Sequence, residues 1–208
     1  MITQKESWEA VDVFQFVMEQ GLDPSKVTEL DIPKHVRKLC TKTFDESWLR
    51  LKNGKQFKEY TSKFPSIINL VPHIGKNVVY FHLDSLRRVI LPTGLESIGV
   101  AAFQNTKVDQ VNFPKTIKFI GWDAFRGSCI TEADLSECDQ LKWLYNNVFR
   151  ECTGLRNVIL PDSLTDIESK SFKDCKKLTS VSLPVSVETI GRAVFSGCDK
   201  LVIYIRLN

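Results

Sequence analysis

Three cysteine residues recur at a fixed interval in the last third of this sequence. Cys152, Cys175 and Cys198 are 23 residues apart, and each follows a phenylalanine by three positions, whereas Cys129 follows its phenylalanine by four. Thiols at a constant step predict a ladder of side chains that point into a stacked core, with neighbours near disulfide distance. Free cysteines are common buried residues, and the sequence shows no export signal, so we expect all six cysteines to be free core thiols.

Other residue types that carry chemistry form no recognisable site. His35, His73 and His82 are scattered, and no C-x-x-C or H-x-x-x-H pair provides the ligand spacing of a metal centre. The sequence also lacks a nucleophile elbow, a phosphate-binding loop and the glycine pattern that binds dinucleotides. Its carboxylates fall at variable repeat positions that face water, where nothing prepares them for acid–base catalysis. We therefore expect no metal, no cofactor and no enzymatic activity.

Composition and charge narrow the class of partner. The chain has 208 residues, 43% of them hydrophobic and 25% charged, which is ordinary for one globular domain. Its formal net charge of +3 is too small and too evenly spread to indicate nucleic acid or an anionic membrane as the main partner. No apolar stretch approaches the roughly 18 residues of a membrane span. We predict a cytoplasmic protein, and the alternative is a cell-surface or secreted protein whose export signal is missing from the sequence.

An internal repeat of about 23 residues positions all of these side chains. One landmark is a phenylalanine, and the steps between its five copies are 22, 24, 23 and 23 residues: Phe103, Phe125, Phe149, Phe172 and Phe195. A leucine or phenylalanine, usually followed by proline, precedes each of them by a nearly constant interval. The third copy is longer because residues 136–140 contain two additional positions. A distant copy occupies residues 27–44, which align without gaps on residues 178–195.

The apolar rows between these landmarks predict the local structure. The segment L-x-x-V-x-L-P alternates apolar and polar residues, which is typical of a short strand with one buried face. Proline then ends the strand, because it cannot continue the hydrogen-bond ladder. A single coil cannot bury its own leucine, isoleucine and phenylalanine side chains, but stacked coils bury them against one another.

Residues 160–184, LPDSLTDIESKSFKDCKKLTSVSLP, resemble the BspA-type leucine-rich repeat family. The resemblance covers residues 27–44 and about 82–208. It implies an α/β leucine-rich repeat solenoid with a parallel sheet on the concave side and an irregular convex side. It also implies a binding role without a catalytic set. Many members of that family are exported surface proteins, whereas this sequence shows no export signal.

The segments outside the repeat predict two further features. Residues 1–26 form an N-terminal helical cap, with a helix over 3–20, a capping box of Thr3 and Glu6, and a stop at Gly21. A partner-binding helix is the alternative to a cap. Residues 27–208 form the solenoid, with an irregular insertion at about 45–81. Within that insertion, residues 48–63 predict a hairpin or a helix, and residues 64–72 predict a strand.

The polar positions of each strand form the predicted binding surface on the concave side. They flank the buried valine and leucine positions, and their mixed polarity is more typical of protein recognition than of phosphate binding. The predicted partner-binding residues are Glu29, Asp31, Arg88, Ile90, Gln110, Asn112, Glu132, Asp134, Asn157 and Ile159.

Three large rings depart from the repeat pattern and predict a second surface. Phe119 and Trp143 occupy a position that is polar in the other copies, and Trp122 occupies one that holds Ser169 or Arg192 elsewhere. Clustered exposed aromatic residues are typical of interaction hot spots. The alternative is that the N-terminal helix or residues 45–63 cover these rings.

The last apolar segment, residues 201–205, predicts a final strand with an open edge. We accordingly expect a monomer or a weak end-to-end homodimer. Together these features predict a non-catalytic module that recognises another protein through its concave sheet or its aromatic patch. An exported, adhesin-like surface protein is the alternative.

Overall fold

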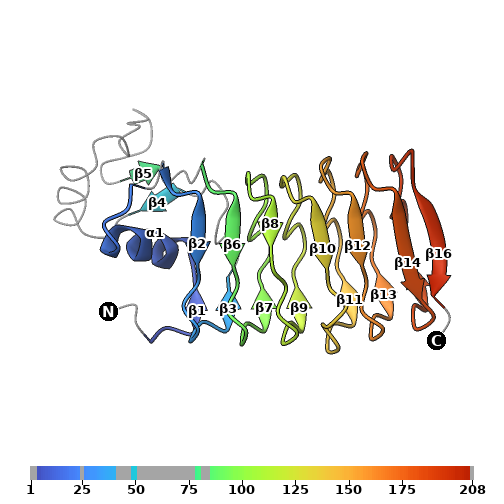
Figure 1. Ribbon diagram of the computed structural model, residues 1–208, viewed down its shortest axis with the longest axis horizontal. Helices are drawn as coiled ribbons and strands as arrows, with labels where there is room; N and C mark the ends of the chain where they lie inside the picture. Colours follow the sequence, from blue (N-terminus) through green and yellow to red (C-terminus); the bar gives the residue numbers. More distant parts are fainter. Residues whose placement is uncertain (1–3, 24–25, 41–47, 51–77, 81–84, 207–208) are drawn as a thin grey trace.

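The computed structural model describes residues 4–23, 26–40, 48–50, 78–80 and 85–206 of the chain. Figure 1 shows these residues as an elongated parallel solenoid, in which each turn of the chain stacks on the turn before it. Nearly every element is a strand of two to five residues, and α1 (Ala10–Glu19) is the one helix of the described residues. The predicted solenoid is therefore confirmed, but the predicted α/β class is wrong, since the architecture is almost entirely β.

The predicted strands form one side of the solenoid, which we call face A. All are parallel, and they form two sheets, β2-β6-β8 and β10-β12-β14-β16. Their register aligns the buried valine positions of successive coils, for example Ala133 with Val158 and Val158 with Val181. The strands are β2 (Glu29–Asp31), β6 (Arg88–Ile90), β8 (Gln110–Val111), β10 (Glu132–Asp134), β12 (Asn157–Ile159), β14 (Ser180–Pro184) and β16 (Val202–Arg206).

A second side, face B, is also built of parallel strands. Its sheets are β1-β3-β7-β9 and β11-β13-β15. In β3, β7, β9, β11 and β13 an outward residue precedes a buried leucine or isoleucine, whereas β1 ends in the buried Trp8 and Ile190 of β15 is 51% exposed. The predicted irregular convex side is thus wrong, because two extended residues per coil suffice to form a ladder. The strands are β1 (Ser7–Trp8), β3 (Lys38–Leu39), β7 (Ser97–Ile98), β9 (Phe119–Ile120), β11 (Trp143–Leu144), β13 (Asp166–Ile167) and β15 (Thr189–Ile190).

The remaining side, the turn face, carries the repeat phenylalanines and is equally regular. The N–H of Phe125 donates to the Val148 carbonyl at 2.9 Å, and the N–H of Phe149 donates to the Ser171 carbonyl at 2.8 Å. The residues two before and two after each phenylalanine have positive φ, a conformation that favours glycine, asparagine and aspartate. This alternation directs N–H and C=O groups along the solenoid axis, so that each turn pairs with the next.

The phenylalanine side chains form the predicted continuous column. Successive rings from Phe103 to Phe195 stack with centroid distances of 4.9, 5.4, 5.5 and 5.6 Å. The first four are fully buried. Because each ring contacts the ring of the next coil, burial of one coil depends on its neighbours.

The distant repeat at residues 27–44 is confirmed as a coil over the part that the structure describes. Strand β2 pairs with β6 and β3 pairs with β7, while Leu30, Ile32 and Leu39 are buried. From the insertion, β4 (Trp48–Arg50) and β5 (Val78–Tyr80) form an antiparallel pair. The elements predicted for residues 51–77 lie outside the described residues, as does the capping residue Thr3.

The N-terminal segment differs from the predicted helical cap. The helix begins at Ala10 instead of residue 3, because Ser7 and Trp8 pair with β3 in face B. The capping contact of the first turn therefore forms at Glu9, whose N–H donates to the Asp12 carboxylate. The predicted capping box was that of Thr3 and Glu6. The stop at Gly21 is confirmed: its φ is 70°, and the Leu22 N–H bonds the Val17 carbonyl, as in a Schellman motif. The predicted cap over residues 1–26 is thus one short helix, whose Val13, Val17 and Met18 join the core.

Candidate functional site

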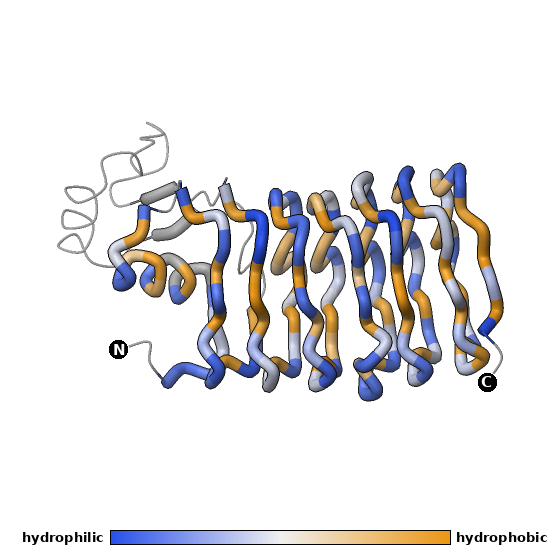
Figure 2. The backbone as a smooth tube through the Cα atoms, viewed as in Figure 1, coloured by the Kyte–Doolittle hydropathy of each residue, from blue (hydrophilic) through white to orange (hydrophobic). Residues whose placement is uncertain are grey.

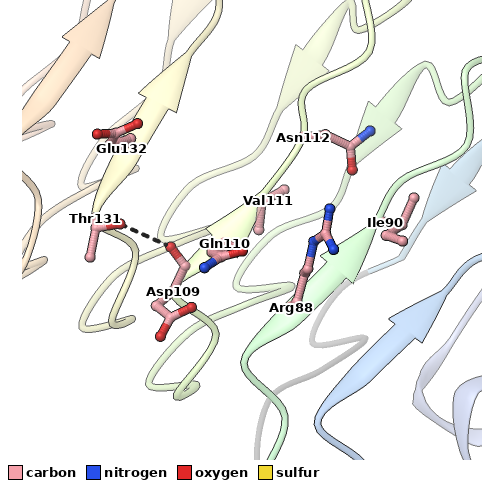
Figure 3. Close-up of a pocket in the computed structure, with 8 residues that line it drawn as sticks. All are labelled: Arg88, Ile90, Asp109, Gln110, Val111, Asn112, Thr131 and Glu132. Carbon is pink, nitrogen blue, oxygen red and sulfur yellow. Dashed lines mark hydrogen bonds between the residues drawn. The ribbon is translucent and has the colours of Figure 1, made fainter.

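A groove of about 500 Å³ lies on face A where β6, β8 and β10 meet (Figure 3). Five of the ten predicted partner-binding residues line it. Ile90 and Val111 are apolar and half-buried, and polar side chains surround them. The lining residues are Arg88, Ile90, Asp109, Gln110, Val111, Asn112, Thr131 and Glu132.

The other predicted face A residues extend this surface in both directions. Strand register aligns Glu29 with Arg88 on one side of the groove, and Glu132 with Asn157 on the other. All ten predicted residues are exposed or half-buried on the outer side of face A. The five outside the groove are Glu29, Asp31, Asp134, Asn157 and Ile159.

The groove coincides with a break in face A. No ladder joins β8 to β10 within the described chain, whereas β10, β12, β14 and β16 are continuous. The break occurs where Phe113 replaces the usual leucine and Ala133 replaces the usual valine. We call the boundary between the coils of Phe125 and Phe149 the junction.

Asn112 has a structural role beside the junction that the sequence did not reveal. Its side-chain amide accepts a hydrogen bond from the Leu91 N–H at 2.8 Å and donates one to the Leu91 carbonyl at 3.0 Å. In the first coil the equivalent bond is made by backbone alone, from the Ile32 N–H to the Ile90 carbonyl at 3.0 Å. The Asn112 amide thus replaces backbone pairing and is less available to a partner than predicted.

The groove is electrostatically mixed. Arg88 pairs with Glu29 at 3.2 Å, and both side chains are about half exposed, so the ion pair is a surface pair with a small energetic effect. Asp109 and Glu132 add carboxylates on the other side, and Thr131 donates to the Asp109 carbonyl at 3.3 Å. This arrangement provides hydrogen-bonding groups around an apolar floor, which suits a segment of polypeptide.

The three residues of the predicted aromatic patch lie on face B at the same junction, but among the described residues ring contacts join only Phe119 and Trp122 to Tyr145, while Trp143 hydrogen-bonds Asp166 of the next coil. Trp122 is 52% exposed and Trp143 is 45% exposed, so neither α1 nor any other described segment covers them. Phe119 is half-buried against Tyr145, with ring centroids 5.1 Å apart, and Trp122 lies 6.1 Å from Tyr145 at 83°. The other segment predicted to cover the rings was residues 45–63. Of that segment, residues 45–47 and 51–63 lie outside the described residues.

Tyr145 belongs to this cluster but was missed from the sequence. It follows the buried Leu144 at a repeat position that holds Gly99, Gly121 and Gly191 in other copies. A Cβ at those glycines would lie 2.4–2.7 Å from backbone atoms of the preceding coil. The departure from glycine was the available signal at Tyr145, although Glu168 fills the same position one coil later, where β11 and β13 remain paired.

Face B is interrupted at the junction as face A is. No ladder joins β9 to β11 within the described residues, although the Glu168 N–H one coil later bonds the Leu144 carbonyl at 2.8 Å. The turn face stays continuous, with Phe125 and Phe149 stacked. Both predicted surfaces thus lie at one coil boundary, where the face B ladder is interrupted, face A keeps the backbone bond from the Thr131 N–H to the Asp109 carbonyl at 3.2 Å, and the turn face is continuous.

The pattern of the BspA type leucine rich repeat region matches residues 73–202 in six copies. The chain belongs to this family. The match omits the coil at residues 27–40, which the strand pairing of β2 and β3 adds to this BspA-type solenoid.

A solved structure has the same fold, and two others are similar. A leucine-rich repeat protein from Bacteroides ovatus is 22% identical, with a TM-score of 0.64 over 87% of this chain and 37% of its own. A leucine-rich repeat protein from Eubacterium ventriosum is 20% identical, with a TM-score of 0.48 over 88% and 45%. A leucine rich cell surface protein from Faecalibacterium prausnitzii is 22% identical, with a TM-score of 0.48 over 86% and 48%. This BspA-type chain spans less than half the length of each, and no curated protein matches it.

The cysteines of this BspA-type solenoid are all free, and three of them form the predicted ladder. The thiols of Cys152, Cys175 and Cys198 donate to the carbonyls of Phe125, Phe149 and Phe172 at 2.9–3.0 Å. Burial raises the pKa of the Cys152 thiol to about 12. The prediction of a core position is wrong for Cys129, which is exposed. Ser128 is buried instead, at the position three residues after the repeat phenylalanine.

Two other features of the BspA-type chain bear on its chemistry. Within the described part of the chain, no three His, Cys, Asp or Glu side chains lie close enough to hold a metal ion, and no helix is long and apolar enough to cross a membrane. A second hollow of about 410 Å³, which the sequence did not reveal, is lined by Arg156, Lys177, Thr179 and Lys200.

Proposed function

We propose that this chain is a non-catalytic module that binds another protein through face A, at the groove over the junction. The observation that carries the proposal is the position of the groove, at the only break in the face A ladder of the described residues, where the half-buried Ile90 and Val111 lie among polar side chains. An apolar centre within a polar rim is the usual composition of a protein-binding patch.

The chemistry of the groove supports binding more than catalysis. Its charged groups are Arg88, Asp109 and Glu132, and Arg88 is already paired with Glu29. A nucleophile and a base within hydrogen-bond reach of one another would favour an enzyme, and the lining provides no such pair. Backbone edges at an interrupted ladder also favour an extended partner segment, which adds main-chain hydrogen bonds to side-chain contacts.

A cytoplasmic location is part of the proposal. Six free thiols, two of them with pKa values raised to about 12, fit a reducing compartment, where disulfides do not persist. A cell-surface or secreted protein is the alternative. Titration of the unfolded natural protein with a thiol reagent separates the two: six free thiols favour the cytoplasm, and fewer contradict it.

Selection from a random-peptide phage library tests the binding proposal. We expect peptides selected on the intact chain to bind Arg88→Ala and Glu132→Ala at least about fivefold more weakly, which corresponds to roughly 1 kcal/mol of an interface contact. Lys115→Ala, an exposed substitution outside the groove, is the matched control and should bind as the unaltered chain does. Peptides that bind all three variants equally, or no selected peptides, would overturn the proposal.

A further inference from the structure

The aromatic cluster of face B, Phe119, Trp122, Trp143 and Tyr145, has a geometry suited to a flat cation. Two of its rings are about half exposed, and Trp122 is nearly perpendicular to Tyr145. Rings at steep angles present faces and edges to one region of space instead of covering one another. An exposed tryptophan face is the strongest aromatic partner for a cation.

Carboxylates lie beside the cluster on the next coil. Strand register places Asp166 opposite Trp143, and Glu168 accepts hydrogen bonds from the N–H and the side chain of Asn146 at 3.1 and 2.8 Å. Neither carboxylate makes an ion pair with any described residue. By contrast, Glu96 three coils earlier pairs with Lys118 at 3.3 Å. The cluster is therefore bordered by negative charge that the described chain does not neutralise.

Asp166 is held in its ionised form. The hydroxyl groups of Thr165 and Thr189 donate to its carboxylate, and they lower its pKa below the ordinary value. The Trp143 side chain contributes a further hydrogen bond to the same carboxylate. The charge is thus fixed beside the exposed indole, and its position is set by two neighbouring strands.

We propose that the aromatic cluster, together with Asp166 and Glu168, binds an arginine-bearing segment of the partner protein, an inference that rests on the proposed function and names the partner's chemistry. A guanidinium group is planar, so it can stack on an indole and donate to a carboxylate at the same time. A lysine ammonium provides charge without the stacking plane. The complementarity is therefore greatest for arginine.

The cation that opposes this arrangement is Lys142, which precedes Trp143, is exposed and makes no ion pair with the described residues. Its charge repels a guanidinium at the cluster. Replacing Lys142 with alanine should therefore strengthen binding of the same ligand, whereas a purely apolar site would not respond in this direction.

A titration with short peptides tests the inference. The probe is acetyl-Gly-Arg-Gly-Arg-Gly-amide, the control replaces both arginines with uncharged citrulline, and the readout is the indole N–H signals of Trp122 and Trp143. We expect the arginine peptide to shift both signals and the citrulline peptide to bind several-fold more weakly. Trp143→Ala and Asp166→Asn should each weaken binding about two- to fivefold, and Lys142→Ala should strengthen it.

Matched measurements separate a folding defect from lost binding. Each variant is compared by its melting temperature, and Asp166→Asn keeps one of the two oxygens that accept hydrogen bonds from Thr165 and Thr189. Equal binding of both peptides, or a shift produced by a neutral oligosaccharide alone, would overturn the inference. Library peptides that depend on Trp143 without enrichment in arginine would contradict it, whereas the dependence of library peptides on Arg88 and Glu132 tests the proposed function separately. A library that yields no binder contradicts the proposed function itself.

Discussion

The junction and the coils that follow it are built from the same repeat but differ in strand pairing. From β12 to β14 and from β13 to β15, both sheets continue from one coil to the next in unbroken register. Between β8 and β10, and between β9 and β11, both ladders of the described chain stop, although the phenylalanine column and the turn face continue. One side of a solenoid can therefore hold two coils together where the strand ladders of the other two sides are interrupted.

Four local departures from the repeat accompany this difference. Phe113 and Ala133 change the size of core residues, Tyr145 replaces a glycine, and residues 136–140 contain two additional positions. Elsewhere the glycines bring backbones into such close approach that a Cβ would collide with the preceding coil.

The largest expected effect of a single substitution lies in the part that both regions share. Phe149→Ala removes a fully buried ring that stacks on Phe125 and Phe172, so we expect a loss of about 3–5 kcal/mol of unfolding free energy. Trp122→Ala, a change of similar size at a half-exposed ring, should cost much less. Urea denaturation measures both, and equal losses would show that the column is not what joins the coils.

Asn112→Ala should have the next largest effect, about 2 kcal/mol, because it leaves the N–H and the carbonyl of Leu91 without their partners. Ser182→Ala alters the equivalent position of a regular coil, where the backbone ladder itself is intact, and should change stability by less than about 0.5 kcal/mol. The same denaturation experiment measures both variants. A neutral Asn112→Ala would contradict the role of this side chain in replacing backbone pairing.

A smaller effect is expected from pH. The pKa of Cys152 is about 12 in the folded chain against an ordinary value of 9.0, so the unfolded chain releases this proton first as pH rises. Stability should therefore fall between pH 9 and 12, by about 1 kcal/mol at pH 10 from this thiol. Cys152→Ser removes this contribution, and the difference between the two unfolding profiles measures it. An unchanged pH slope in the variant would contradict the assignment.

The smallest expected effect concerns the last strand. Figure 2 shows β16 as a largely hydrophobic stretch, and Val202, Ile203, Tyr204 and Ile205 are 46–69% exposed. We predict weak self-association through this edge, detectable by light scattering at high concentration and removed by Ile203→Lys. If the chain is a strict monomer at every concentration, the predicted weak homodimer is wrong and the predicted monomer remains.

The sequence was sufficient for those features that depend on repetition. The phenylalanine column, the strand register of face A and the distant coil at residues 27–40 all follow from apolar rows at one interval. The second sheet was missed because two-residue strands carry too little alternation to be recognised. The start of α1 was misplaced because pairing of Ser7 and Trp8 with β3 is a tertiary contact, which outweighs a local capping pattern.

The candidate sites could be predicted only where a residue was compared with the same repeat position in the other copies. Trp122 and Trp143 departed from a polar column and were found, whereas Tyr145 replaced a glycine and was not compared with it. The structural role of Asn112 depends on where the Leu91 backbone lies in space, so spacing alone could not reveal it.

Residue-resolved hydrogen exchange tests the central claim, that the face B sheet is open at the junction while the turn face is closed. The N–H groups of Trp143 and Tyr145 should exchange at least about tenfold faster than those of Asp166 and Glu168, their equivalents one coil later. The N–H of Phe125, which bonds across the same junction on the turn face, should remain protected. Equal protection of the four face B amides would contradict the account.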